Sequence, residues 1–61
     1  MRIVFFDKLR ETYKSIENIA QLENTMIKSN GRLTNCWLLI ETDGTTKTFK
    51  QKDFSIYRIE G

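Results

Sequence analysis

Two short runs of the sequence, Ile3 to Phe6 and Cys36 to Ile40, are hydrophobic at consecutive positions. Successive side chains of a β-strand point to opposite faces, so a strand with one face in water alternates apolar and polar residues. Both runs instead carry large apolar side chains on both faces, and something must cover the second face. The chain has only 61 residues with which to cover these faces. We expect a single domain, residues 1–61, with a small core.

The two halves of the chain resemble each other. A shift of 36 positions places three parts of the first half over three parts of the second: Ile3-Val4 over Leu39-Ile40, Asp7 over Asp43, and Thr12-Tyr13-Lys14 over Thr48-Phe49-Lys50. After a one-residue gap, residues 19–23 fall over residues 56–60. The shared pattern is an apolar strand, a turn opened by Asp, a second strand and a third strand. The repeat predicts a small all-β domain, in which two similar hairpin-plus-strand units form a compact sheet or an SH3-like barrel.

The second unit has the clearer pattern. Residues 36–41 are apolar, Asp43-Gly44 is a pair favoured in tight hairpin turns, and residues 46–50 are rich in β-branched and aromatic side chains. Residues 54–59 then resume an apolar pattern typical of a strand. We expect a hairpin followed by a terminal strand.

The first unit is open to two interpretations. By analogy with the second unit, residues 2–6, 10–14 and 18–23 form strands. A stripe of apolar residues also recurs at the spacing of one helical face: Leu9, Tyr13, Ile16, Ala20 and Ile27. The alternative is therefore an α+β fold of a strand, a helix over about residues 8–29 that stops at Asn30-Gly31, and three antiparallel strands.

The sequence offers few groups for catalysis. It has no histidine and one cysteine, Cys36, which removes the commonest general base, the usual partner of a Ser or Cys nucleophile and the structural zinc sets. Asp7 and Asp43 hold equivalent turns, and Glu23 and Glu60 hold equivalent strand ends; these structural roles explain the four acids. We expect no enzyme, no metal site and no cofactor.

Apolar strand faces that the core does not use are candidate docking surfaces. A curled barrel, a helix or a partner protein would each cover them. Val4 and Phe6 share one face of the first run, and Trp37 and Leu39 share one face of the second. Aromatic side chains are enriched at the energetic centres of protein interfaces. We expect a non-catalytic binding protein that docks on or inhibits a protein partner, or forms a homodimer, through Trp37, Leu39, Phe6 and Val4.

Single-stranded nucleic acid is the alternative partner. The C-terminal hairpin and strand carry cations that would track phosphates and a ring that would stack on a base: Lys47, Lys50, Lys52, Arg58 and Tyr57. Ten basic and eight acidic residues give a net charge of +2, a weak field for a polyanion. Strict alternation also places Tyr57 and Arg58 on opposite faces of their strand. We therefore rank nucleic acid second to a protein partner.

Neither apolar run approaches the roughly 20 residues of a membrane-spanning helix. A lone thiol in a chain without an Asn-x-Ser/Thr sequence fits the reducing cytosol, and we expect a cytoplasmic protein with no membrane partner. The small size and the Ile, Lys, Asn and Thr content resemble short reading frames of phages and plasmids from low-GC bacteria. The hairpin pattern resembles small SH3-like barrels. Neither resemblance rests on a motif, so no functional residue is carried over from it.

Overall fold

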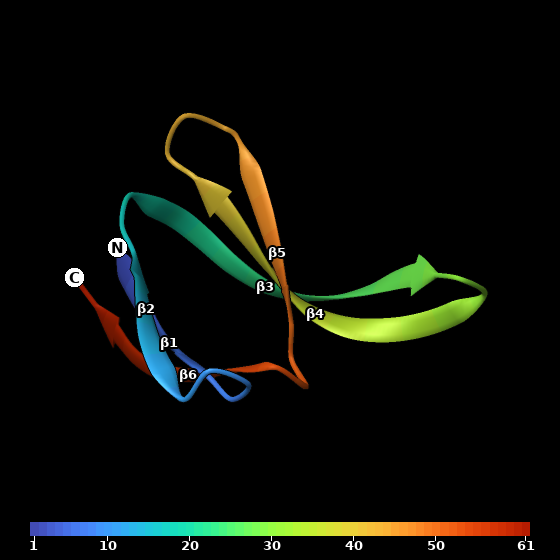
Figure 1. The fold of residues 1–61 in the computed structure, drawn as a ribbon. Coiled ribbons are helices and arrows are strands. Elements are labelled where there is room, and N and C mark those ends of the chain that lie inside the picture. Colours follow the sequence, from blue (N-terminus) through green and yellow to red (C-terminus); the bar gives the residue numbers. More distant parts are fainter.

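The structure is a computed structural model that describes residues 1–61, and it consists of β-strands and turns (Figure 1). Its strands, in chain order, are β1 Arg2–Asp7, β2 Thr12–Ile16, β3 Ile19–Ser29, β4 Arg32–Glu41, β5 Thr46–Lys50 and β6 Phe54–Glu60. The predicted small all-β domain is confirmed. The structure has no helix capable of spanning a membrane.

The alternative helix over residues 8–29 is wrong. This segment contains β2 and β3, and Glu11 and Asn18, in the turns on either side of β2, have left-handed φ angles of 55° and 60°. The stripe that suggested a helix is not a buried face either, because Leu9 is 74% exposed and Tyr13 is 61% exposed. Two strands joined by turns reproduce the helical spacing, and spacing alone does not separate the two structures.

The strands form two antiparallel sheets with the orders β2-β1-β6 and β3-β4-β5. Each sheet combines the hairpin of one repeat unit with the third strand of the other unit: the β1–β2 hairpin pairs with β6, and the β4–β5 hairpin pairs with β3. Ile3 and Leu39, which are equivalent in the repeat, are both fully buried. The units therefore exchange their third strands, and the exchange ties the two halves of the chain together.

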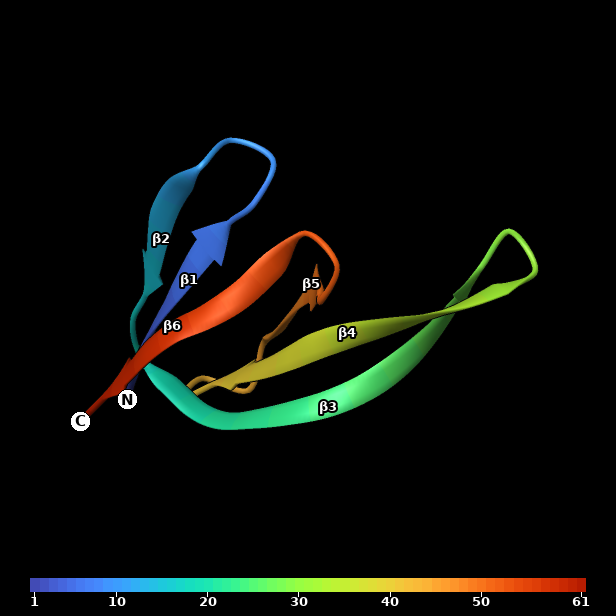
Figure 2. The same cartoon turned by 90° about the horizontal axis from the view of Figure 1, so that it is seen from below.

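The core lies between the two sheets; in Figure 2, β1 and β6 lie above β3 and β4. Its buried side chains come from both sheets: Ile3, Phe5, Ile16, Ile19 and Leu39. The ring of Phe5 lies 5.2 Å from that of Phe49 in the other sheet, measured between centroids, and 6.3 Å from that of Phe54. Trp37 Nε1 donates a 3.0 Å hydrogen bond to the carbonyl oxygen of Phe54, joining β4 to β6. Aromatic contacts and the Trp37 hydrogen bond thus connect the sheets. At the start of β3, the backbone N–H of Ile19 also donates a 2.9 Å hydrogen bond to the carbonyl oxygen of Met1, which precedes β1.

Strand β4 turns Trp37 and Leu39 toward the core, and Leu38 and Ile40 away from it. Leu39 is fully buried, Trp37 packs against the core cluster, and Leu38 and Ile40 are half-exposed. This orientation is the opposite of the expected one. From the sequence, Trp37 and Leu39 were predicted to form an exposed docking surface. Both faces of β4 are apolar here, so alternation cannot say which face meets the core.

The β3–β4 hairpin extends beyond the body of the protein as a two-stranded ribbon, residues 26–35, here called the ribbon arm (Figures 1 and 2). Strand β5 pairs with residues 36–40 of β4 and leaves the arm without a third strand. At the tip, Asn30 and Gly31 have φ angles of 50° and 76°, as a type I′ hairpin turn requires at both central positions. The pair that the sequence suggested as a helix stop is a hairpin turn.

Candidate binding surface

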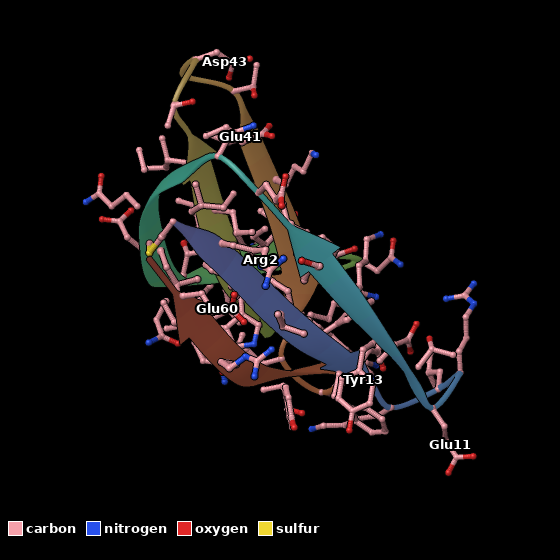
Figure 3. The ribbon with its side chains drawn as sticks, turned by 90° about the vertical axis from the view of Figure 1, so that its left-hand side faces the viewer. Arg2, Glu11, Tyr13, Glu41, Asp43 and Glu60 are labelled. Atoms are coloured by element: carbon pink, nitrogen blue, oxygen red, sulfur yellow. The ribbon has the colours of Figure 1, made fainter.

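Three aromatic side chains cluster on the outer face of sheet β2-β1-β6, and we call them the aromatic face: Phe6, Tyr13 and Tyr57. Phe6 and Tyr13 are direct cross-strand partners with ring centroids 5.2 Å apart. Tyr13 and Tyr57 meet edge to face at 4.8 Å. Tyr13 and Tyr57 are 61% and 59% exposed, whereas Phe6 is half-buried. Figure 3 views the molecule from this side, with Tyr13 at one end of the sheet.

A β-bulge in β6 places Tyr57 on this face. Val4 pairs with Arg58 and Phe5 pairs with Ile56, so Tyr57 is an extra residue in β6. Ile56, the partner of Phe5, also packs against the core. Tyr57 and Arg58 both lie on the outer side, where the Arg58 guanidinium carbon is 5.9 Å from the centre of the Tyr57 ring. Bulges commonly re-aim side chains in this way. The strict alternation expected from the sequence therefore fails at Tyr57.

The charged groups on the outer face neutralise one another. The Glu60 carboxylate pairs with both Arg2 and Arg58, and Arg2 also lies 3.8 Å from Glu17 (Figure 3). The hydrogen bond from Arg2 lowers the pKa of Glu60 by more than partial burial raises it, and the positive charges of Arg2 and Arg58 lower it further. Two guanidinium groups and two carboxylates leave the face close to neutral. The exposed rings are therefore the groups on this face that are available to bind a partner.

The four residues predicted to bind a protein partner do not form one surface. Val4 and Phe6 lie with the aromatic face, although Val4 is 9% exposed. Leu39 is fully buried and offers no surface to a partner, and Trp37 is half-buried with its N–H group bonded to Phe54. Tyr13 was not among the residues predicted to bind a partner, because its spacing fits the helical stripe. The repeat would not have found it, because it aligns Tyr13 with Phe49, which packs against the core, whereas Tyr13 is 61% exposed.

The residues predicted to bind nucleic acid are also divided. Lys47 on β5 lies 3.5 Å from Glu41, and Lys50 and Lys52 line a hollow beside the ribbon arm. Tyr57 and Arg58 belong to the other sheet. The predicted combination of three lysines with a stacking ring is therefore not present as one surface.

The two repeat-related aspartates stabilise turns. The buried Asp7 accepts hydrogen bonds from the backbone N–H groups of Leu9 (3.0 Å) and Arg10 (3.2 Å) and from the Arg10 guanidinium (3.1 Å). Asp43 accepts one from the N–H of Thr45 at 3.0 Å and one from its hydroxyl at 2.7 Å. These are the ordinary roles of Asp in tight turns. No three His, Cys, Asp or Glu side chains are grouped so as to hold a metal ion.

The hydrogen bonds of Asp7 predict an acid-sensitive stability. Burial alone raises its pKa, but the hydrogen bonds from Arg10 and Leu9 outweigh burial and lower the pKa below its usual value. As the pH falls below about 4, the unfolded chain takes up this proton before the folded chain does, so the free energy of unfolding decreases. In urea titrations at a series of pH values, the stability difference between wild type and Asp7→Asn should shrink as the pH falls. Parallel pH profiles for the two proteins would contradict this role.

Comparison of the chain with known proteins finds no relative. No protein-family model, curated protein or solved structure matches it. We take the function from the chemistry of the surfaces themselves.

Proposed function

We propose that this chain is a non-catalytic binding module that docks on a protein partner through the aromatic face. One observation carries the proposal: the rings of Tyr13 and Tyr57 contact each other on a hydrogen-bonded three-stranded sheet, and both side chains remain about 60% exposed. Tyrosines on a rigid support bring large contact area at a small cost in side-chain entropy, and their hydroxyl groups can hydrogen-bond across an interface. Rings of this kind are enriched at interface hot spots.

The charge and size of the face favour a protein. Arg2 and Arg58 are engaged by Glu60, so they are not free to neutralise phosphates, and the matching surface is apolar and uncharged. A standard interface buries about 800 Å² on each partner, roughly a fifth of the 4406 Å² surface of this chain. The molecule measures 36 × 28 × 13 Å along its principal axes, so an interface of that size would extend beyond the three rings over much of one broad side. The partner is a second protein, which the module either recruits or inhibits.

Site-specific crosslinking tests where the partner binds. A photoreactive phenylalanine analogue is placed at Tyr13 in one protein, and at Thr48, an exposed residue of β5 in the other sheet, in a control protein. We expect the group at position 13 to crosslink one partner protein that the group at position 48 does not capture. That partner, once purified, should bind the chain in solution. Capture from Thr48 alone would contradict the aromatic face as the docking surface. Self-association of the pure chain that Tyr13→Ala abolishes would replace the second protein by a second copy.

A further inference from the structure

The ribbon arm is a second, chemically different surface. Residues 26–35 form strand pairs only with each other and project from the body, as both views show (Figures 1 and 2). At the base of the arm, the backbone N–H of Gln51 donates a 3.0 Å hydrogen bond to the carbonyl oxygen of Asn35. An isolated two-stranded ribbon is marginally stable in water. Its apolar side chains are nevertheless exposed, Met26 to 56% and Leu33 to 65%. A ribbon that stands free of the core in this way is positioned to contact something outside the protein.

Unpaired positive charge gathers around the arm. Lys28 and Arg32 lie on the arm, and Lys50 and Lys52 lie at its base; none of the four is within ion-pair distance of a carboxylate. Arg32, Lys50 and Lys52 line one hollow together with small polar residues: Ser29, Asn30 and Thr34. Arg32 and Lys52 also line a second hollow, again without an acidic residue. The residues from 24 to 40 and from 44 to 52 include no Asp or Glu at all.

The opposite end of the molecule provides the contrast. Lys14 and Lys47 line a hollow there, but Glu17 and Glu41 line it with them, and Lys47 is paired with Glu41 at 3.5 Å. Net charge alone therefore does not describe this protein. Its weak overall charge of +2 is distributed so that one end is mixed and the arm end is purely cationic.

We propose that the ribbon arm enters the major groove of duplex DNA while Lys50 and Lys52 contact the flanking phosphates. The B-form major groove is about 12 Å wide and admits a two-stranded β-ribbon, whose strands lie about 4.8 Å apart. Unpaired Lys and Arg side chains bind phosphates by releasing counterions. The aliphatic side chains of the arm suit contact with thymine methyl groups.

The composition of the arm separates duplex DNA from the other polyanions. The arm carries no aromatic residue, whereas binders of single strands stack bases on rings. The major groove of duplex RNA is deep and narrow, and side chains do not read it. Duplex DNA is therefore the partner that the shape and charge of the arm fit, and this surface is independent of the aromatic face.

Fluorescence anisotropy with a short labelled DNA duplex tests the proposal. Four phosphate contacts predict a slope of roughly −3.6 for log affinity against log salt concentration, or about a 100-fold loss between about 50 and 200 mM salt. The double variants Lys28→Gln/Arg32→Gln and Lys50→Gln/Lys52→Gln should each weaken binding about tenfold or more at low salt and reduce the slope to roughly −2. All four side chains are exposed, so circular dichroism should show that the variants remain folded.

The matched control is Lys14→Gln/Lys47→Gln, which removes two positive charges at the mixed end. It should leave both the affinity for the duplex and the slope of its salt dependence unchanged. Equal losses in the control and the arm variants would overturn the proposal, because binding would then depend on net charge alone. No binding of the duplex at low salt would also overturn it. Tighter binding of single-stranded DNA, duplex RNA or a polyglutamate peptide than of duplex DNA would assign the arm to that partner instead.

Discussion

Replacing Leu39 by alanine is expected to remove about half of the protein's free energy of unfolding at 25 °C. Leu39 is fully buried, and its equivalent in the repeat, Ile3, is part of the same core cluster. A Leu-to-Ala change at such a site costs about 2–5 kcal/mol. A domain of this size has a total stability of only about 3–9 kcal/mol. Far-ultraviolet circular dichroism and urea titration measure the loss.

Leu33→Ala is the matched control for Leu39→Ala. It makes the same chemical change on the ribbon arm, at a side chain that is 65% exposed, and should alter the free energy of unfolding by less than about 0.5 kcal/mol. A Leu39→Ala protein that folds like the wild type but no longer binds its partner would contradict the structure. It would return Leu39 to the docking surface that the sequence suggested.

Phe5→Ala is expected to have the second large effect, a loss of about 3–5 kcal/mol. Phe5 is fully buried, and its ring contacts Phe49 of the other sheet and Phe54 at the start of β6. Removing it takes away a ring that joins the two sheets and leaves a cavity between them. Chemical denaturation gives the free energy, and a broad, weakly cooperative transition would accompany the loss of packing between the sheets.

The neighbouring residue supplies the comparison for Phe5→Ala. Phe6→Ala removes the same ring from the opposite face of β1, where the side chain is half-buried against Tyr13. Its cost in stability should be about half that of Phe5→Ala or less, because less area leaves the core. Equal losses for the two variants would contradict the assignment of Phe5 to the core and of Phe6 to the aromatic face.

The sequence predicted the strands well where turn chemistry marked their ends. Residues 36–41, 46–50 and 54–59 were expected as strands, and the structure has β4 ending at Glu41, β5 at Thr46–Lys50 and β6 at Phe54–Glu60. Asp43 hydrogen-bonds to Thr45 in the intervening turn, which is local chemistry that a sequence displays. The same repeat correctly indicated that the first half contains strands as well, against its helical spacing.

Three features needed the three-dimensional structure. The orientation of β4 was not predictable because both of its faces are apolar, and only packing against the other sheet buries Leu39. The bulge at Tyr57 depends on its pairing with β1, which is distant in sequence. The ribbon arm arises because β3 and β4 are longer than β5, so its exposure is a property of the sheet as a whole. Each of the three determines which residues can reach a partner.

The affinity of the crosslinked partner for a double variant tests the proposed function most directly. Tyr13→Ala/Tyr57→Ala removes the two exposed rings of the aromatic face, and titration calorimetry should show binding weakened about 100-fold, the equivalent of roughly 2–3 kcal/mol at two hot-spot residues. The control variant Met26→Ala/Leu33→Ala removes exposed apolar area from the ribbon arm. It should bind the partner with the affinity of the wild type. Unchanged affinity of the folded tyrosine variant, together with weakened binding by the arm variant, would contradict the aromatic face as the docking surface.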